Sequence, residues 1–545
     1  MTEAGKGTSL RKRIFRAGLA VGAAHLLFKF AGLIQAQAMG RCLEKGTFDV
    51  VYAFAFENCI FSLFLIGEEV IGPAFLPVFM RECGDGPEGD KKAWSFAGAF
   101  FTLQLTVLLA VVAALVFFPE LPVRLLTKWS PDNKPEAFLL AAQSVRHLAP
   151  ALIGLSLGST TYVILNSYKR FFLAAFGDAV WKLSVVAALM LFAAKAADAA
   201  SVLIWGLVAG SVLKFLSHLW GLRDKLRNFR PSFKWNSPAL RSMALLALPL
   251  LAGIIFAKFR DIFNNVYVLT ALDADGLMQA NSMGRKLQSV LHWIIPYTLS
   301  IAVFPFFCEM ADKGDREGLG EFITRSGRQL LAIFVPFAAL TAVISVPLTE
   351  IVFGGGNFDA VSVRRTALSM SCYNFVLPAA AIEAIIMQAF FAAKRTLAVS
   401  VAGIVFSSVS ILISLIGLHY FRDNGFVLLG IIAGGFAISR WMKTASLIVL
   451  FRKSAPAFPF RPTLLFLAKL ILASALADAA GYAVTAPVTA LTAKFLHVGK
   501  LAALAQIALC GGCGLVVLLA AYKLVGITEP FDLVKAAISA RKKNK

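Results

Sequence analysis

The sequence predicts an all-α polytopic membrane protein with about fourteen transmembrane helices. Of its 545 residues, 58% are hydrophobic and only 15% are charged, whereas a soluble protein usually carries about 25% charged residues. The mean hydropathy is +0.75. Apolar runs of about 20 residues, the length that crosses a bilayer as a helix, recur from one end of the chain to the other.

The expected helices follow from these apolar runs, which polar or basic loops separate. Several runs are longer than a bilayer requires, so tilted helices are expected. No loop is large enough for a soluble catalytic domain, and the chain is therefore expected to be a transporter rather than an enzyme. The expected spans are residues 18–39, 48–80, 93–118, 138–166, 171–195, 201–221, 242–271, 276–308, 325–352, 363–392, 397–419, 426–451, 463–486 and 499–524.

The distribution of charge predicts the orientation of these spans. The net charge is +22, and the termini and the alternate loops on their side carry most of the Lys and Arg residues that lie outside the expected spans. Positive residues mark the cytoplasmic side, so both termini are expected there, in a bacterial inner membrane. Basic residues in short loops fit an anionic lipid surface and argue against nucleic-acid binding.

A weak internal repeat divides the chain near its middle. KFAGLIQ at Lys29 matches KFRDIFN at Lys258, and Pro77 in FLPVF matches Pro305 in VFPFF, at offsets of 229 and 228. Two six-span halves with the same orientation are one repeat geometry of secondary transporters, whose substrate site lies between the halves. The expected organisation is a basic N-terminus (1–17), an N-lobe (18–221), a basic linker (222–241), a C-lobe (242–451), two extra helices (452–525) and a basic cytoplasmic tail (526–545).

The seventh expected span contains an unusual polar segment, AKFRDIFNN. On an α-helical wheel Lys258, Arg260, Asp261, Asn264 and Asn265 share one arc of about 160°. A charge at the centre of a span costs about 2.5–3.5 kcal/mol, so three of them require partners or a polar cavity. Lys258 and Asp261, three residues apart, can pair with each other. A substrate-facing, water-filled site is the favoured interpretation, and an ion-pair cluster between helices is the alternative.

Charges in other spans extend this candidate site. Lys29 lies well inside the first span and is the repeat partner of Lys258. Glu57 and Glu68 share one stripe of the second span. By the repeat offset Glu57 corresponds to Arg285, so the two could form a gate that closes when they pair; a permanent tie between the halves is the alternative.

The remaining intramembrane polar residues are interpreted as packing features. Asp178 with Lys182, and Glu383, are expected to form packing pairs, whereas Arg440 and Lys443 are expected to extend toward the lipid–water interface. The CGGC sequence at 510–513 has no histidine nearby, so small residues at a helix contact are a better explanation than a metal or redox site.

Four motifs resemble one known family, the MurJ-type lipid II flippases of the MOP (multidrug/oligosaccharidyl-lipid/polysaccharide) exporter superfamily. They are GEEVIGPAFLPVF (67–79), ILNSYKRFFLAA (164–175), VFGGGNFDA (352–360) and QAFFAAKRT (388–396). The resemblance covers roughly residues 15–450. It implies two six-helix lobes that rock around a cationic cavity holding a lipid-linked sugar pyrophosphate. It also implies that the last two helices form a groove for the polyprenyl tail.

The chain departs from the family pattern at several cavity cations. Gln35 stands where the first helix of the family carries Arg, and Leu63 and Phe64 stand where the second carries an Arg pair. The eighth-helix Arg of the family is retained as Arg285, with Lys286 beside it. Lys29, Lys258 and Arg260 are therefore expected to supply the cavity's positive charge.

The predicted function is translocation of a polyprenyl-pyrophosphate-linked glycan, with lipid II as the favoured substrate. The alternatives are a flippase for another lipid-linked oligosaccharide, a cation-coupled multidrug exporter, a membrane enzyme acting on such lipids, and a scaffold. No cofactor is expected; coupling to a monovalent cation or to the membrane potential is left open, and cell-wall synthesis proteins are further candidate partners. The expected substrate-binding residues are Lys29, Lys258, Arg260, Arg285, Lys286, Asn264 and Asn265, and the expected gating or ion-coupling residues are Glu57, Glu68 and Asp261.

Overall fold

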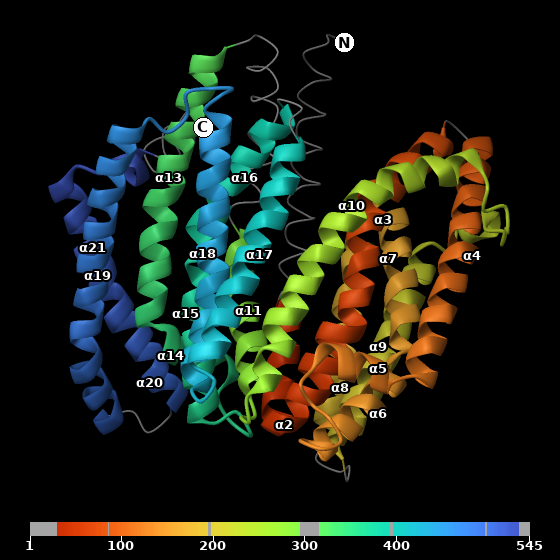
Figure 1. The fold of residues 1–545 in the computed structure, drawn as a ribbon, viewed down its shortest axis with the longest axis horizontal. Coiled ribbons are helices and arrows are strands. Elements are labelled where there is room, and N and C mark those ends of the chain that lie inside the picture. Colours follow the sequence, from red (N-terminus) through yellow and green to blue (C-terminus); the bar gives the residue numbers. More distant parts are fainter. Residues whose placement is uncertain are drawn as a thin grey trace. The chain divides into compact units, whose positions relative to one another are not determined.

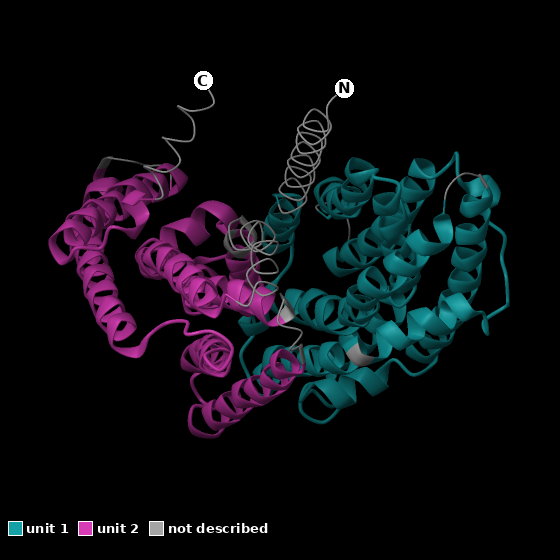
Figure 2. Cartoon of the chain, turned by 90° about the horizontal axis from the view of Figure 1, so that it is seen from above, with its two compact units in different colours: residues 1–278 teal, residues 279–545 magenta. Residues whose placement is uncertain are grey.

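The computed structural model describes residues 30–84, 87–193, 198–294, 315–392, 396–495 and 499–532. The chain is helical, as predicted: the one β pairing among the described residues is an isolated bridge between Gly355 and Phe358 (Figure 1). It divides into two compact units, residues 1–278 and 279–545, coloured separately in Figure 2.

The first unit contains the helices that carry most of the candidate site. Residues 30–42 are helical. The elements that follow are α2 (Lys45–Thr47), η1 (Phe48–Ile60), α3 (Phe61–Cys83), α4 (Pro87–Phe117), α5 (Glu120–Leu126), α6 (Pro135–Leu148), α7 (Ala151–Ser167), α8 (Phe171–Phe192), α9 (Ala199–Gly221), η2 (Leu226–Asn228), α10 (Pro238–Ile262), η3 (Phe263–Tyr267) and η4 (Leu269–Ala271).

Small residues bring α7, α8 and α9 into close contact. A Cβ added at Gly154 of α7 would lie 2.7 Å from the backbone carbon of Ser211 on α9, and one added at Gly210 of α9 would lie 2.7 Å from the Trp181 carbonyl oxygen on α8. Helix association in a membrane depends on such close packing, because lipid tails are as apolar as the helix surfaces. These glycines therefore position the polar side chains that α8 and α9 contribute to the interior.

The segment 222–241, the expected linker, is packed against α4. The Phe229 ring meets those of Trp94 and Phe101 edge-on, with centroids 6.2 and 5.7 Å away. A Cβ added at Gly98 would clash with the Arg230 carbonyl oxygen. The chain then continues into α10, which lies along α3 in the first unit. The first compact unit continues beyond α10 to Met278.

The second unit contains the remaining helices. They are α11 (Leu277–Ile294, whose first two residues belong to the first unit), α13 (Arg316–Val343), α14 (Ser345–Phe353), α15 (Ala360–Asn374), α16 (Val376–Ala392), α17 (Thr396–Tyr420), α18 (Gly425–Phe451), α19 (Phe460–Phe495), α20 (Gly499–Gln506), η5 (Ile507–Gly511) and α21 (Gly512–Val525).

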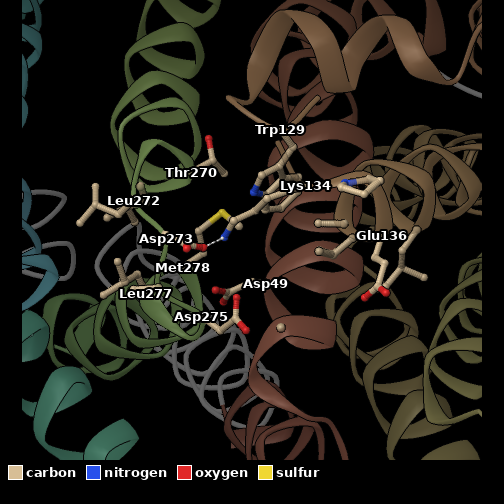
Figure 3. A pocket seen from close by; sticks show the side chains of 17 residues that line it. Asp49, Trp129, Lys134, Glu136, Thr270, Leu272, Asp273, Asp275, Leu277 and Met278 are labelled. Atoms are coloured by element: carbon tan, nitrogen blue, oxygen red, sulfur yellow. Dashed lines mark ion pairs between the residues drawn. The ribbon is translucent and has the colours of Figure 1, made fainter. Parts of the chain in front are cut away.

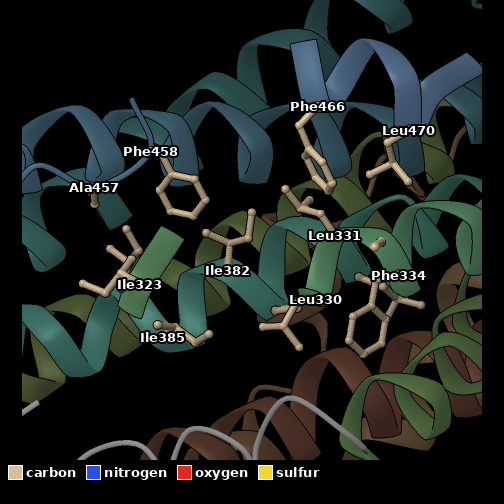
Figure 4. Close-up of a cluster of buried hydrophobic side chains, with 14 of the residues drawn as sticks. Ile323, Leu330, Leu331, Phe334, Ile382, Ile385, Ala457, Phe458, Phe466 and Leu470 are labelled. Atoms are coloured by element: carbon tan, nitrogen blue, oxygen red, sulfur yellow. The ribbon is translucent and has the colours of Figure 1, made fainter. Parts of the chain in front are cut away.

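The core of the second unit forms where α13, α16, α18 and α19 meet the loop after α18 (Figure 4). Phe458 of this loop is 2% exposed, and its backbone N–H donates to Thr324 Oγ1 over 2.7 Å. Its ring fills the space beside Gly327, where an added Cβ would clash with the ring. The loop thereby fixes the start of α19 to α13.

The apolar helices agree with the predicted spans as far as they are described. Ten helices of the described part are long and apolar enough to cross a membrane, and twelve if each bent pair is one span. Each of the twelve overlaps a different predicted span. The two other predicted spans, 18–39 and 276–308, lie partly outside the described residues, so the total of fourteen stays a prediction.

Candidate functional site

The polar segment of the seventh span forms the end of α10. Lys258 Nζ lies 2.5 Å from Glu69 Oε1 on α3, and the Lys258 side chain is 14% exposed. Arg260 donates from Nε and Nη2 to Asp261 Oδ1 over 3.0 and 2.7 Å. The expected Lys258–Asp261 pair is therefore wrong. Lys258 reaches across to α3 instead, and Asp261 pairs with its neighbour Arg260.

The two asparagines do not continue the same α-helical wheel. The α-helix ends at Ile262, and Asn264 and Asn265 lie in the π-helical turn η3. A π-turn has a wider repeat than an α-helix, and such turns occur often at functional sites. Both side chains are buried, at 3% and 7% exposed. The expected α-helical wheel therefore ends at Ile262 and does not extend to the two asparagines.

A second ion pair joins α8 and α9. Lys214 Nζ contacts Asp178 Oδ1 at 2.7 Å, and the Lys214 side chain is only 2% exposed. The same ammonium lies 5.2 Å from the centroid of the Phe64 ring on α3. Gly158 makes room for it, since an added Cβ would lie 3.2 Å from Lys214 Cε. The expected pairing of Asp178 with Lys182 is therefore wrong.

Glu68 is placed between these two ion pairs. The charges that act on its carboxyl group are those of Lys214, Asp178, Glu69 and Lys258. Glu68 thus belongs to a five-residue network across α3, α8, α9 and α10.

His218, one turn after Lys214, joins the network to the backbone of its neighbours. Its Nδ1 lies 3.0 Å from Thr161 Oγ1 and 2.9 Å from the Gly158 carbonyl oxygen, and its Nε2 lies 3.0 Å from the Ala174 carbonyl oxygen. The histidine is fully buried. Through these contacts His218 of α9 connects α7 and α8.

The second unit holds Arg285 and Lys286 on α11. The Arg285 guanidinium carbon lies 5.7 Å from the Tyr373 ring centroid and 6.0 Å from that of Phe436. Lys286 Nζ donates to Ser282 Oγ over 3.2 Å. Glu57 belongs to the first unit, on η1, so the proposed gate between Glu57 and Arg285 stays a prediction. Lys29 lies outside the described residues.

The second unit also contains a charged triad, of which the sequence interpretation anticipated only that Glu383 takes part in packing. Glu383 of α16, 2% exposed, contacts Arg440 Nε at 2.5 Å and Lys443 Nζ at 2.6 Å, both on α18. The expectation that Arg440 and Lys443 extend toward the lipid interface is wrong, because a buried carboxylate draws both inward.

Two residues that the sequence interpretation overlooked, Lys214 and His218, were detectable. They lie one turn apart inside the expected span 201–221, and an inventory of every titratable residue within a span would have included them. Their partners were not detectable in the same way, because Asp178 and Lys214 are on different helices.

The comparisons with known proteins identify the family. A family model described as lipid II flippase MurJ matches residues 36–501, which include every expected site residue except Lys29. This chain belongs to the MurJ family. A probable lipid II flippase MurJ of Bdellovibrio bacteriovorus is 24% identical over 431 residues, 78% of this chain and 80% of that protein.

Solved structures show that the fold is that of MurJ and its superfamily. A lipid II flippase MurJ in an inward closed conformation aligns with a TM-score of 0.69 and 18% identity, over 93% of this chain and 98% of the other. An inward-facing MATE-family multidrug resistance transporter of the MOP superfamily aligns at 0.65 with 13% identity, over 78% and 94%. MurJ membership also makes the chain a multi-pass membrane protein of a transporter family, consistent with its apolar helices.

Proposed function

We propose that the chain translocates lipid II, a polyprenyl-pyrophosphate-linked glycan, across the bacterial inner membrane by alternating access. The observation that carries the proposal is the presence of two cations, Lys258 and Arg260, inside a span of a MurJ-family chain. A pyrophosphate crossing a bilayer needs charge-assisted hydrogen bonds along its path, whereas an apolar tail can stay in lipid. Cations inside a span are costly unless they serve such a path or a permanent pair.

The pairing observed in the first unit suggests how these cations act. Each has an acidic partner: Glu69 for Lys258, and Asp261 for Arg260. The substrate pyrophosphate would displace the acids from their cations, and the acids would return when the substrate leaves. Neither state then leaves a cation unpaired inside the membrane, which keeps the cost of the empty transporter low.

Other residues complete the proposal. Arg285 and Lys286 supply cations from the second unit, the buried asparagines at 264 and 265 bind sugar or phosphate oxygens, and Lys29 adds charge from the first span. Glu57, Glu68 and Asp261 act as gating or ion-coupling groups. Both termini lie in the cytoplasm, transport is coupled to a monovalent cation or to the membrane potential, and cell-wall synthesis proteins are candidate partners.

The decisive experiment measures the sidedness of lipid II in cells. The protein is depleted, the cells are converted to spheroplasts, and an external enzyme cleaves only outward-facing lipid II. Protected lipid II should accumulate on depletion and disappear when the wild-type chain is restored. An unchanged outward fraction would mean that the chain carries another lipid-linked glycan.

A set of matched variants separates a substrate contact from a structural ion pair. Lys258→Met should abolish rescue. The double variant Lys258→Met/Glu69→Leu removes both charges of the pair and restores electrostatic balance. If Lys258 binds substrate, the double variant stays inactive. If Lys258 serves only as a structural ion-pair partner of Glu69, activity returns. Arg124→Met, which alters an exposed arginine on α5, is the control and should rescue fully.

A further inference from the structure

A cavity in the first unit lies outside the charged network described above. It has a volume of about 420 Å³ and opens where the start of η1, the start of α6 and the segment 269–278 meet (Figure 3). This volume is within the range of small-molecule sites, about 300–1,000 Å³. On the orientation proposed above, these segments lie at the outer ends of their spans.

The cavity lining is rich in carboxylates. It contains Asp49, Glu136, Asp273 and Asp275, with Lys134 as its one lysine. Lys134 Nζ pairs with Asp273 Oδ1 at 2.8 Å, at a position where the Asp273 side chain is 94% exposed. This contact lowers the pKa of the Asp273 carboxyl group, which therefore stays ionised. Figure 3 shows Asp49 and Asp275 together on another part of the lining.

Two lysines close to the cavity do not line it. Lys128 lies with its ammonium 4.2 Å from the Tyr267 ring centroid. Lys45 packs its aliphatic chain against Gly276, where an added Cβ would lie 3.2 Å from Lys45 Cδ. Gly276 has a φ of +81°, which a glycine adopts without strain, and its N–H donates to Asp49 Oδ2 over 2.7 Å. The backbone thus fixes Asp49 in place, 5% exposed.

Trp129 provides an independent indication of a ligand. Its side chain is 6% exposed, lines the cavity and meets Phe54 edge-on, with ring centroids 5.7 Å apart. No hydrogen bond joins its indole N–H to another described residue, and this nitrogen is not among the buried side-chain atoms of the described part that lack a partner, so the N–H is open to the cavity. The indole therefore offers a donor for a carbonyl oxygen and an aromatic face for a cation.

An organic ammonium group fits this lining better than a metal ion. No three acidic, histidine or cysteine side chains of the described residues converge as metal ligands. The carboxylates around the cavity suit an ammonium group, and the tryptophan ring suits a short apolar stem that carries it. The indole N–H suits a carbonyl group next to that stem. This combination is found in a peptide that contains a diamino acid.

We infer that this cavity binds the amine-bearing peptide portion of the translocated headgroup, with the carboxylates facing its ammonium and Trp129 donating to its carbonyl oxygen. The identity of the ligand rests on the proposed function, because lipid II carries a stem peptide with a diamino acid. Binding on the outer side would hold the headgroup after its passage and disfavour its return.

Binding is tested without translocation, on the purified full-length protein in nanodiscs. The probe is the soluble pentapeptide L-Ala-γ-D-Glu-L-Lys-D-Ala-D-Ala, measured by calorimetry, and its Nε-acetylated form is the control. The free amine should bind and the acetylated peptide should not. Glu136→Gln should weaken binding by roughly three- to five-fold, as expected for one partly exposed charge. Asp132→Asn, in the same loop but outside the lining, should have no effect.

Two further variants test the geometry. Lys134→Met removes the one lining cation and frees Asp273, so it should strengthen binding roughly three- to five-fold. Trp129→Phe keeps the aromatic wall but loses the N–H, and should weaken binding of the pentapeptide while leaving its preference for the free amine. Equal binding of both peptides, competition by millimolar Ca²⁺, or weaker binding by Lys134→Met would overturn the inference.

The outcome is separable from that of the proposed function. If the spheroplast assay shows lipid II translocation but the pentapeptide does not bind, the inference is wrong and the function stands. If the pentapeptide binds as described but lipid II sidedness does not depend on the protein, the cavity stands as an ammonium site and the proposed substrate is wrong.

Discussion

Removal of the buried lysine on α9 should destabilise the protein far more than removal of an exposed one. Lys214→Met leaves the Asp178 carboxylate, 16% exposed, without the ammonium that lies 2.7 Å away. Loss of one partner of a buried ion pair costs about 3–5 kcal/mol, because the other charge stays buried. Glu68, whose carboxyl group also faces Lys214, adds a second uncompensated acid. The folded-to-unfolded ratio should fall by more than about 100-fold.

The free energy of unfolding is measured by steric trapping in bicelles. Arg124→Met is the matched control, because Arg124 pairs with Glu120 at a similar distance, 2.9 Å, but the two side chains are 60% and 56% exposed. That variant should cost at most about 0.5 kcal/mol. The double variant Lys214→Met/Asp178→Leu should recover most of the loss, since apolar replacements of a buried pair are often neutral. The reasoning is refuted if Lys214→Met costs no more than Arg124→Met, or if the double variant is the least stable.

Three further predictions follow from other charged groups. Glu383→Gln leaves Arg440 and Lys443 without their shared carboxylate and should destabilise the fold by about 3 kcal/mol. Glu321→Gln, on the exposed face of α13, is the control and should not destabilise it. Thermal unfolding in detergent compares the two variants, and equal melting temperatures would argue against the triad. Asp224 accepts two hydrogen bonds from Arg170 at 2.6 Å, and these lower the pKa of its carboxyl group to about 2. Because this pKa lies below the unfolded value of about 4, the stability that the pair contributes is present above pH 4 and is lost as the pH falls toward 2. The melting temperature of Asp224→Asn should therefore fall less than that of wild type between pH 5 and pH 3. Asp478, near the middle of α19, has a buried Oδ1 with no hydrogen-bond partner within the described residues, so Asp478→Leu should raise stability by roughly 1–3 kcal/mol; a lower melting temperature would reveal a partner beyond the described part of the chain.

The fold and the family were predictable because the patterns that specify them are local. Twelve of the expected spans correspond to helices of the described part, since apolar length decides whether a segment crosses a membrane. The motifs around 67–79 and 352–360 indicated the family that the family model matches over 36–501. The presence of charges inside the seventh span was also visible, because an unusual residue in an apolar run stands out by itself.

The partners of those charges were not predictable, and each error has the same cause. Helical spacing considers one helix at a time. It therefore predicted an ion pair between Lys258 and Asp261, and it predicted that Arg440 and Lys443 extend toward the lipid–water interface. The actual partners, Glu69 on α3 and Glu383 on α16, belong to neighbouring helices. The π-turn at 263–267 was hidden as well, because apolar periodicity does not reveal one additional residue in a helical turn.

The sequence by itself therefore determined the membrane character, the approximate spans, the family and the residues worth testing. Only the tertiary structure decided which acid neutralises which base, that the segment 222–241 packs on α4, and that carboxylates from three separate segments share a cavity with Trp129. The physical reason is that insertion into a bilayer depends on the composition of each segment in turn. Electrostatic compensation depends on distances of a few ångströms between segments, and these arise only when small residues such as Gly154 and Gly210 bring the helices together.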